Sequence, residues 1–115
     1  MSNDLDTTLA ALADPTRRQV VELLRERPRR AGELASACAM SNPAMSRHLR
    51  VLRASGLVEV EEQQGSNDAR YRVYWLRSDP FIDLQKWLDQ VQAFWTDQLG
   101  AFKDYAERTQ KGKRT

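Results

Sequence analysis

Apolar residues recur along this chain with two different periods. Up to about residue 55 they return every three or four positions, which is the spacing of a helix buried on one face. The pattern predicts four helices, over residues 5–13, 15–27, 31–39 and 42–55. The period then shortens to two over residues 57–62 and, in part, 71–77, which predicts two β-strands around a polar tip at 63–69. A last helix is expected over residues 79–109.

Helix start and stop signals support these boundaries. Asp14 followed by Pro15 is typical of a helix start, with Asp as N-cap and Pro at the first helical position. Ser41 can accept a hydrogen bond from an amide of the next helix, and Pro43 lies in its first turn, where a missing N–H costs nothing. Gly56 ends that helix.

The helix over residues 42–55 has two unlike faces. Met45, Leu49 and Leu52 form an apolar face, which we expect Val51 to widen toward the core. The other face is polar and basic, and such a helix suits the DNA major groove. Together with the helix before it, this segment predicts a helix-turn-helix over residues 31–55, and the hairpin over residues 57–77 predicts a wing.

The first turns of this helix are expected to contact DNA. Asn42 can pair with adenine, although simple helix capping is an alternative role. Ala44 can touch a thymine methyl group, and Arg47 and Arg50 reach guanine edges or phosphates, phosphate being the commoner target. The predicted DNA-binding residues are Ser41, Asn42, Pro43, Ala44, Ser46, Arg47, His48, Arg50, Arg70 and Arg72.

Three members of that set, His48, Arg70 and Arg72, lie beside apolar positions in the sequence. His48 flanks the apolar face of its helix, so it either helps to pack the helix or donates to a phosphate. Arg70 and Arg72 alternate with Tyr71 and Val73, which predicts a strand with one packed face and one face toward solvent or DNA. Minor-groove or phosphate contact is favoured for these two arginines.

The last predicted helix carries more large apolar residues than a small monomer can cover. Its stripe would expose a patch beyond the few hundred Å² that are usual, which favours pairing with a second copy and a contribution from the first helix. The alternative is that half of the stripe packs on the winged domain of the same chain. A twofold dimer would read a palindrome with half-sites about one turn apart. The predicted dimer residues are Leu5, Leu9, Trp87, Val91, Phe94, Trp95, Leu99 and Phe102.

Composition adds a charge asymmetry. The 115 residues predict one domain (1–115) with a net charge of only +2. Yet residues 14–55 hold nine Arg against four acidic residues, whereas residues 78–108 hold three basic against six acidic residues. This asymmetry indicates an anionic partner, double-stranded DNA, on one face. The alternative is that the six arginines between residues 17 and 30 only solvate helix surfaces.

The chain offers little for other classes of function. No paired carboxylates, Ser-His-Asp set or phosphate-binding loop is present, so we expect no enzyme and no cofactor. The lone Cys38 fits a reducing compartment, and no signal peptide or apolar span is found, so a cytoplasmic location without membrane attachment is expected. Two alternatives stay open: a winged-helix protein-interaction module, and a ligand- or redox-responsive sensor that uses the aromatic dimer seam.

Two segments resemble a known family. Residues 12–24, Leu-Ala-Asp-Pro-Thr-Arg-Arg-Gln-Val-Val-Glu-Leu-Leu, resemble the opening of ArsR-type transcriptional regulators. Residues 46–58, Ser-Arg-His-Leu-Arg-Val-Leu-Arg-Ala-Ser-Gly-Leu-Val, are similar to their recognition helix and its exit into the wing. The resemblance runs from about residue 5 to residue 95. It implies a mainly α fold with a small hairpin, a winged helix-turn-helix (α-α-α-α-β-β-α), in a homodimeric repressor that occupies an operator.

Many ArsR-type regulators sense metals, but this sequence departs from their sites. The family's Cys-x-Cys pair in the third helix is missing, because residues 33–38 hold only Cys38. A second family site uses Asp and His of the last helix, and the only His here is His48. One Cys and one His do not readily supply three or four metal ligands. The resemblance is therefore to a metal-independent member, with Cys38 as a core residue and an unidentified small-molecule inducer.

Overall fold

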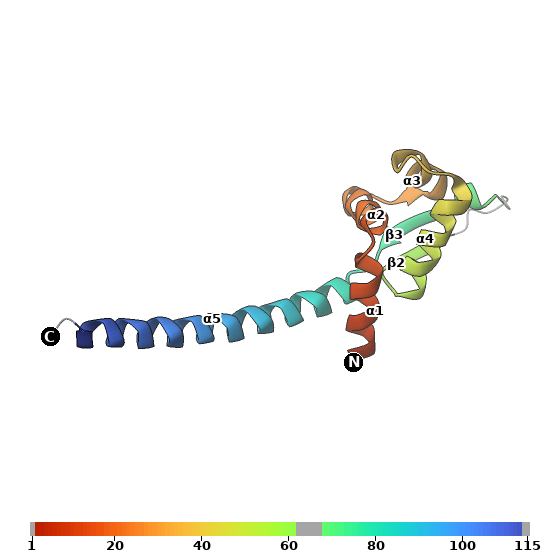
Figure 1. Cartoon of the computed structure of the whole chain (residues 1–115). Coiled ribbons are helices and arrows are strands. Elements are labelled where there is room, and N and C mark those ends of the chain that lie inside the picture. The colour runs from red at the N-terminus through yellow and green to blue at the C-terminus, as the bar shows by residue number, and fades with distance from the viewer. Residues whose placement is uncertain (1, 62–67, 114–115) are drawn as a thin grey trace. The chain divides into compact units, whose positions relative to one another are not determined.

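The computed structural model describes residues 2–61 and 68–113, in a helical chain with a small sheet (Figure 1). Its contacts divide it into two compact units, Met1–Asp83 and Leu84–Thr115. The elements are α1 (Ser2–Leu12), α2 (Pro15–Glu26), β1 (Arg29–Arg30), α3 (Ala31–Ala37), α4 (Asn42–Ala54), β2 (Val58–Glu61), the 3-10 helix η1 (Ala69–Tyr71), β3 (Val73–Leu76) and α5 (Asp79–Lys113). The predicted polar tip falls mostly on residues 62–67, outside the described residues.

The predicted helix signals are confirmed. The Asp14 carboxylate accepts a hydrogen bond from the backbone N–H of Arg17 at 3.0 Å and so caps α2. The Ser41 hydroxyl accepts one from the N–H of Ala44 at 3.2 Å and caps α4. Gly56 follows the last residues of α4 with a φ of +75°, a conformation that a glycine adopts without strain. These local rules fix where both helices begin and where α4 ends.

The core of the first unit lies where α2, α3 and α4 gather around the sheet (Figure 1). Met45, Leu49 and Leu52 of α4 are at most 1% exposed, as predicted. Full burial of each such side chain stabilises the fold by about 1.5–3 kcal/mol. The other buried apolar residues are Ala11, Val20, Leu24, Leu34, Ala35, Leu57, Val58 and Tyr74.

Two predicted helix details are wrong. Val51 is 39% exposed and does not widen the apolar face of α4. Each helical residue turns by about 100°, so Val51 points well away from the side that Leu49 and Leu52 share. The third helix ends at Ala37 instead of residue 39, because Ala39 takes a positive φ of 54° in the turn that follows.

The sheet has one strand more than predicted. Its order is β1-β3-β2, and β3 pairs antiparallel with both neighbours. Arg29 lies opposite Tyr74 and Arg30 lies opposite Val73. A two-residue strand is too short to show alternation in the sequence, which explains why β1 was not expected. It joins the start of α3 to the wing.

The predicted strand face at Tyr71 is also wrong. Tyr71 lies in η1 and is 44% exposed, so the alternation of Arg70 and Arg72 with apolar partners does not hold there. The cause is local, since the Asp68 carboxylate accepts a hydrogen bond from the N–H of Arg70 at 2.9 Å and starts the 3-10 turn. The strand begins two residues later, at Val73.

The first helix is held by arginines of the second. The Arg17 Nε donates to the carbonyl oxygen of Ala11 at 2.6 Å, and Arg18 donates to those of Leu12 at 2.8 Å and Ala13 at 3.0 Å. These carbonyls have no partner within α1 itself, as at any helix C-terminus. The Asp-Pro-Thr-Arg-Arg motif therefore both starts α2 and closes α1.

Candidate nucleic-acid interface

The exposed face of α4 carries most of the predicted DNA-binding residues. With its apolar side fixed in the core, α4 leaves Ala44 and His48 half-buried and six of the predicted residues exposed: Ser41, Asn42, Pro43, Ser46, Arg47 and Arg50. The geometry presents polar and basic groups on the surface of a rigidly anchored helix, which is the arrangement that groove binding needs.

The arginines of α4 differ from those of α2 in what they contact. Within residues 2–61 and 68–113, Arg47, Arg50 and Arg53 form no hydrogen bond or ion pair through their side chains. By contrast, Arg25 pairs with Glu22 at 3.3 Å, and Arg17 bonds to α1. The α4 guanidinium groups are thus available to phosphates and base edges, which are their usual targets in DNA complexes.

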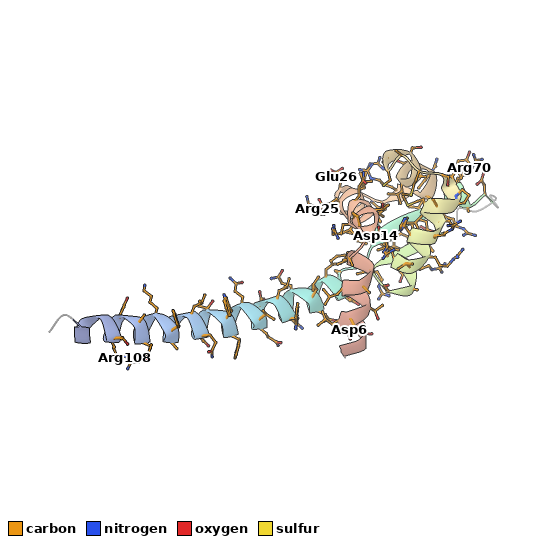
Figure 2. The ribbon with its side chains drawn as sticks, viewed as in Figure 1. Asp6, Asp14, Arg25, Glu26, Arg70 and Arg108 are labelled. Atoms are coloured by element: carbon orange, nitrogen blue, oxygen red, sulfur yellow. The ribbon has the colours of Figure 1, made fainter. Side chains whose placement is uncertain are left out.

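The wing residues meet the first turns of α4. Asn42 and Ser46 line a small hollow of about 40 Å³ together with Arg70 and Arg72. Figure 2 shows Arg70 beside the wing, on the side of the first unit where α4 begins. The structure thus brings together two groups of predicted DNA-binding residues that are more than twenty positions apart in the sequence.

Arg70 is engaged by a carboxylate of its own chain. Its Nε lies 2.9 Å from Oδ2 and 3.1 Å from Oδ1 of Asp68. The side-chain hydrogen bonds from the Arg70 guanidinium hold the pKa of Asp68 below its ordinary value, so this carboxylate stays ionised. A phosphate that approaches Arg70 must therefore compete with Asp68, whereas Arg47 and Arg50 have no such competitor in the described part of the chain.

His48 points toward the start of α2. Its Nδ1 lies 3.5 Å from a guanidinium nitrogen of Arg17 and 3.9 Å from Oδ1 of Asp14. The side chain is 23% exposed. This placement fits the packing alternative for His48, and its contact with a phosphate stays a prediction.

The chain is similar in sequence and in structure to known proteins. The sequence profile of a helix-turn-helix domain family matches residues 12–61. The chain is 39% identical over 97 residues to the HTH-type transcriptional regulator Rv2034 of Mycobacterium tuberculosis, which covers 84% of this chain and 83% of that relative. The crystal structure of the ArsR family transcriptional regulator RHA00566 superposes with a TM-score of 0.74 and 31% identity, covering 84% of this chain and 94% of that one. The chain belongs to the ArsR family of transcriptional regulators.

Membership of the ArsR family confirms the predicted winged helix-turn-helix fold and DNA-binding regulation as the class of function. A shorter match is to the transcriptional repressor SdpR of Bacillus subtilis, 32% identical over 54 residues, 47% of this chain and 60% of that protein. Within this ArsR family fold, α3 and α4 form the helix-turn-helix, and β2 and β3 form the wing.

The predicted dimer residues of this ArsR family member are largely exposed. Leu9 of α1 is 38% exposed and Leu5 is half-buried, while the buried positions of that helix are Thr8 and Ala11. In the second unit every predicted residue of α5 is between 38% and 69% exposed: Trp87, Val91, Phe94, Trp95, Leu99 and Phe102. Leu88 and Tyr105, which the helical periodicity also places on this stripe, are 45% and 64% exposed.

The lone thiol and the candidate metal ligands can also be examined in the described residues. Cys38 is half-buried after α3, and burial raises the pKa of its thiol, which disfavours the reactive thiolate. Across the described residues, no three side chains of His, Cys, Asp or Glu lie close enough together to hold a metal ion.

No helix in the described part of the chain has the length and apolar character to cross a bilayer.

Proposed function

We propose that this ArsR family protein is a repressor that binds a palindromic operator as a homodimer. The observation that carries the proposal is the exposed face of α4. Arg47 and Arg50 have no partner there among the residues that the structure describes, and they lie on the helix that also presents Asn42 and Ser46. The first turns of α4 read base edges, and the arginines of α4 and the wing bind phosphates.

A dimer is supported by the apolar stripe of α5. A helix that exposes large aromatic side chains over five turns is unusual in a protein that works as a monomer. Residues 79–109, with Leu5 and Leu9, serve in this proposal as the dimerisation surface. Two α4 helices related by a twofold axis then read half-sites about one helical turn apart.

Release from DNA follows from any event that changes the angle between the two α4 helices. A ligand or a change of this kind favours the free conformation of the dimer over the DNA-bound one. The population of free dimer then increases, and DNA is released. An unidentified small molecule at the aromatic seam of the dimer is one such event, and quenching of Trp fluorescence by candidate ligands would detect it.

The first experiment is to capture genomic DNA fragments with the purified protein at two salt concentrations and to sequence them. A palindromic motif that persists at the higher salt supports the proposal. Binding without a motif, lost as salt rises, contradicts sequence-specific reading. Weak binding with little salt dependence would instead favour the protein-interaction module, since phosphate contacts always make binding salt-dependent.

The second experiment assigns Arg47. We expect Arg47→Ala to weaken binding to the captured motif by about 1–3 kcal/mol if Arg47 reads a base. Arg25→Ala is the matched control, because Arg25 pairs with Glu22 on α2, away from the interface (Figure 2). Equal losses on the motif and on a scrambled duplex would make Arg47 a phosphate contact, and no loss on either would remove it from the interface.

A further inference from the structure

One arginine near the wing stands apart from its neighbours in the sequence. Five of the six arginines between residues 17 and 30 form hydrogen bonds or ion pairs with carbonyls or carboxylates of their own chain: Arg17, Arg18, Arg25, Arg27 and Arg29. The backbone N–H of Arg30 donates to the Glu33 carboxylate at 3.2 Å, but its guanidinium pairs with no carboxylate among the described residues and lies over the ring of Tyr71, 5.6 Å from the ring centre. The sequence alone does not separate Arg30 from the other five.

The backbone holds Arg30 firmly against the wing. Arg30 pairs with Val73 in the sheet, and the N–H of the next residue, Ala31, donates to the carbonyl oxygen of Arg72 at 3.0 Å. A Cβ on Gly32 would lie 3.5 Å from the carbonyl oxygen of Arg70, so the first turn of α3 and η1 are in close contact. Arg30 is therefore part of the wing root, although it precedes its partner strand β3 by about forty residues.

Tyr71 has a second guanidinium beside it. The Cζ of Arg70 lies 5.9 Å from the centre of the same ring. Two guanidinium groups thus lie beside one aromatic ring, and among the described residues the Asp68 carboxylate binds that of Arg70. The Glu33 carboxylate pairs with Arg27 at 2.9 Å and accepts only the backbone N–H of Arg30. Tyr71 is 44% exposed and Arg30 is exposed, so the cluster is open to solvent and keeps an excess positive charge.

The cluster adjoins the face of α4 that carries base-reading residues. Ala31, which directly follows Arg30, lines the same small hollow as Asn42, Ser46 and Arg70. A planar guanidinium that stacks on an aromatic ring keeps its N–H groups free at the edge, where they match the two oxygens of a phosphate. An anion bound there would lie next to the bases that α4 contacts.

We propose that Arg30 and Tyr71 form a phosphate-binding site at the root of the wing, which grips the DNA backbone beside the bases contacted by the start of α4. This inference rests on the proposed DNA-binding function and adds a contact outside α4 and the wing hairpin. Tyr71 serves as a platform that orients Arg30, and Arg30 makes the contact.

The test is the salt dependence of binding for Arg30→Gln, measured on the captured motif and on a scrambled duplex of equal length. We expect roughly a three- to tenfold loss on both duplexes alike, and a slope of log affinity against log salt that is smaller by about 1. Arg25→Gln is the control, since it removes the same charge from α2. Identical slopes for the two variants would overturn the proposal.

Further variants separate the parts of the site. Arg30→Lys keeps the charge without the stacking plane, so it should retain the slope and lose less affinity than Arg30→Gln. Tyr71→Ala should approach Arg30→Gln in affinity, whereas Tyr71→Phe should match the unaltered protein. A melting temperature equal to that of the unaltered protein confirms that each variant is folded. A Tyr71→Ala protein with undiminished affinity would contradict the role of the ring.

Two results distinguish the failure of this inference from the failure of the proposed function. If the unaltered protein binds no DNA, the proposed function fails, and the site has no ligand to hold. If inorganic phosphate perturbs the Arg30 side-chain NMR signals while DNA affinity is the same for Arg30→Gln and Arg25→Gln, the site takes free phosphate and the proposed DNA contact is wrong.

Discussion

The helix α4 and the part of α5 beyond residue 84 carry the same kind of apolar stripe and have different surroundings. In α4, Met45, Leu49 and Leu52 are at most 1% exposed, because the rest of the first unit covers them. In α5, Phe94 and Phe102 are 66% and 69% exposed, and α5 continues unbroken to Lys113. A sequence pattern thus shows which face needs covering, but not whether the same chain covers it.

The largest expected effect comes from the covered stripe. Leu49→Ala should lower the free energy of unfolding by about 2–5 kcal/mol, because it leaves a cavity in the core of the first unit. Val51→Ala is the matched control on the same helix, since Val51 is 39% exposed, and it should change the value by less than about 0.5 kcal/mol. Urea denaturation at one protein concentration measures both. Similar losses for the two variants would contradict the assignment of the covered face.

The exposed stripe should respond to mutation through association. Trp95→Ala should weaken the homodimer at least about tenfold, equivalent to about 1.4 kcal/mol, because it removes a large aromatic side chain from the proposed seam. Gln90→Ala is the control, since Gln90 is exposed and turned by about 140° from Trp95 around the helix. Sedimentation equilibrium gives both dissociation constants. Equal constants for the two variants would place the seam elsewhere.

The smallest expected effect concerns the charge at the α2 N-cap. The hydrogen bond from the backbone N–H of Arg17 lowers the pKa of Asp14 from its ordinary value of 3.8, so the carboxylate stabilises the folded state above that pH. This contribution is lost as the pH falls through the lower pKa of the folded protein. Asp14→Asn keeps the cap oxygen and should cost about 0.3–1 kcal/mol at neutral pH.

Melting temperatures of Asp14→Asn and the unaltered protein, recorded against pH, check this expectation. The difference between the two should begin to shrink as the pH falls past the ordinary pKa of the carboxyl group and approach zero only below the lowered pKa of the folded protein, where Asp14 is protonated in both folded and unfolded chains. Two curves that stay parallel through the acidic range would show that the charge of Asp14 does not contribute.

The sequence predicted features that depend on near neighbours. The caps at Asp14 and Ser41 and the turn at Gly56 follow from rules that span three or four residues, and the structure confirms them. The buried face of α4 follows from helical periodicity. Family resemblance then supplied the class of function, which no single motif would have done.

Most of what the sequence missed depends on contacts between distant segments, and one error, at Tyr71, has a local cause. The strand β1 exists because Arg29 and Arg30 meet β3 more than forty residues later, and two residues carry no periodic signal. Tyr71 lies outside the strand predicted for it because the nearby Asp68 starts a 3-10 turn. The separation of Arg30 from its neighbouring arginines depends on which carboxylates lie within reach, and only the folded chain decides that.

The unequal engagement of the arginines has a consequence for the order of events during DNA binding. Among the described residues, no bond to a partner has to break before Arg47, Arg50 and Arg53 can contact a duplex. These side chains therefore do not slow the first association step. Electrostatic steering of this kind raises association rates toward about 10⁸–10⁹ M⁻¹s⁻¹ at low salt. In the proposed complex, Arg70 binds DNA only after its bond to Asp68 opens. We therefore expect a rapid encounter through α4, followed by a slower closing of the wing that sets the lifetime of the complex.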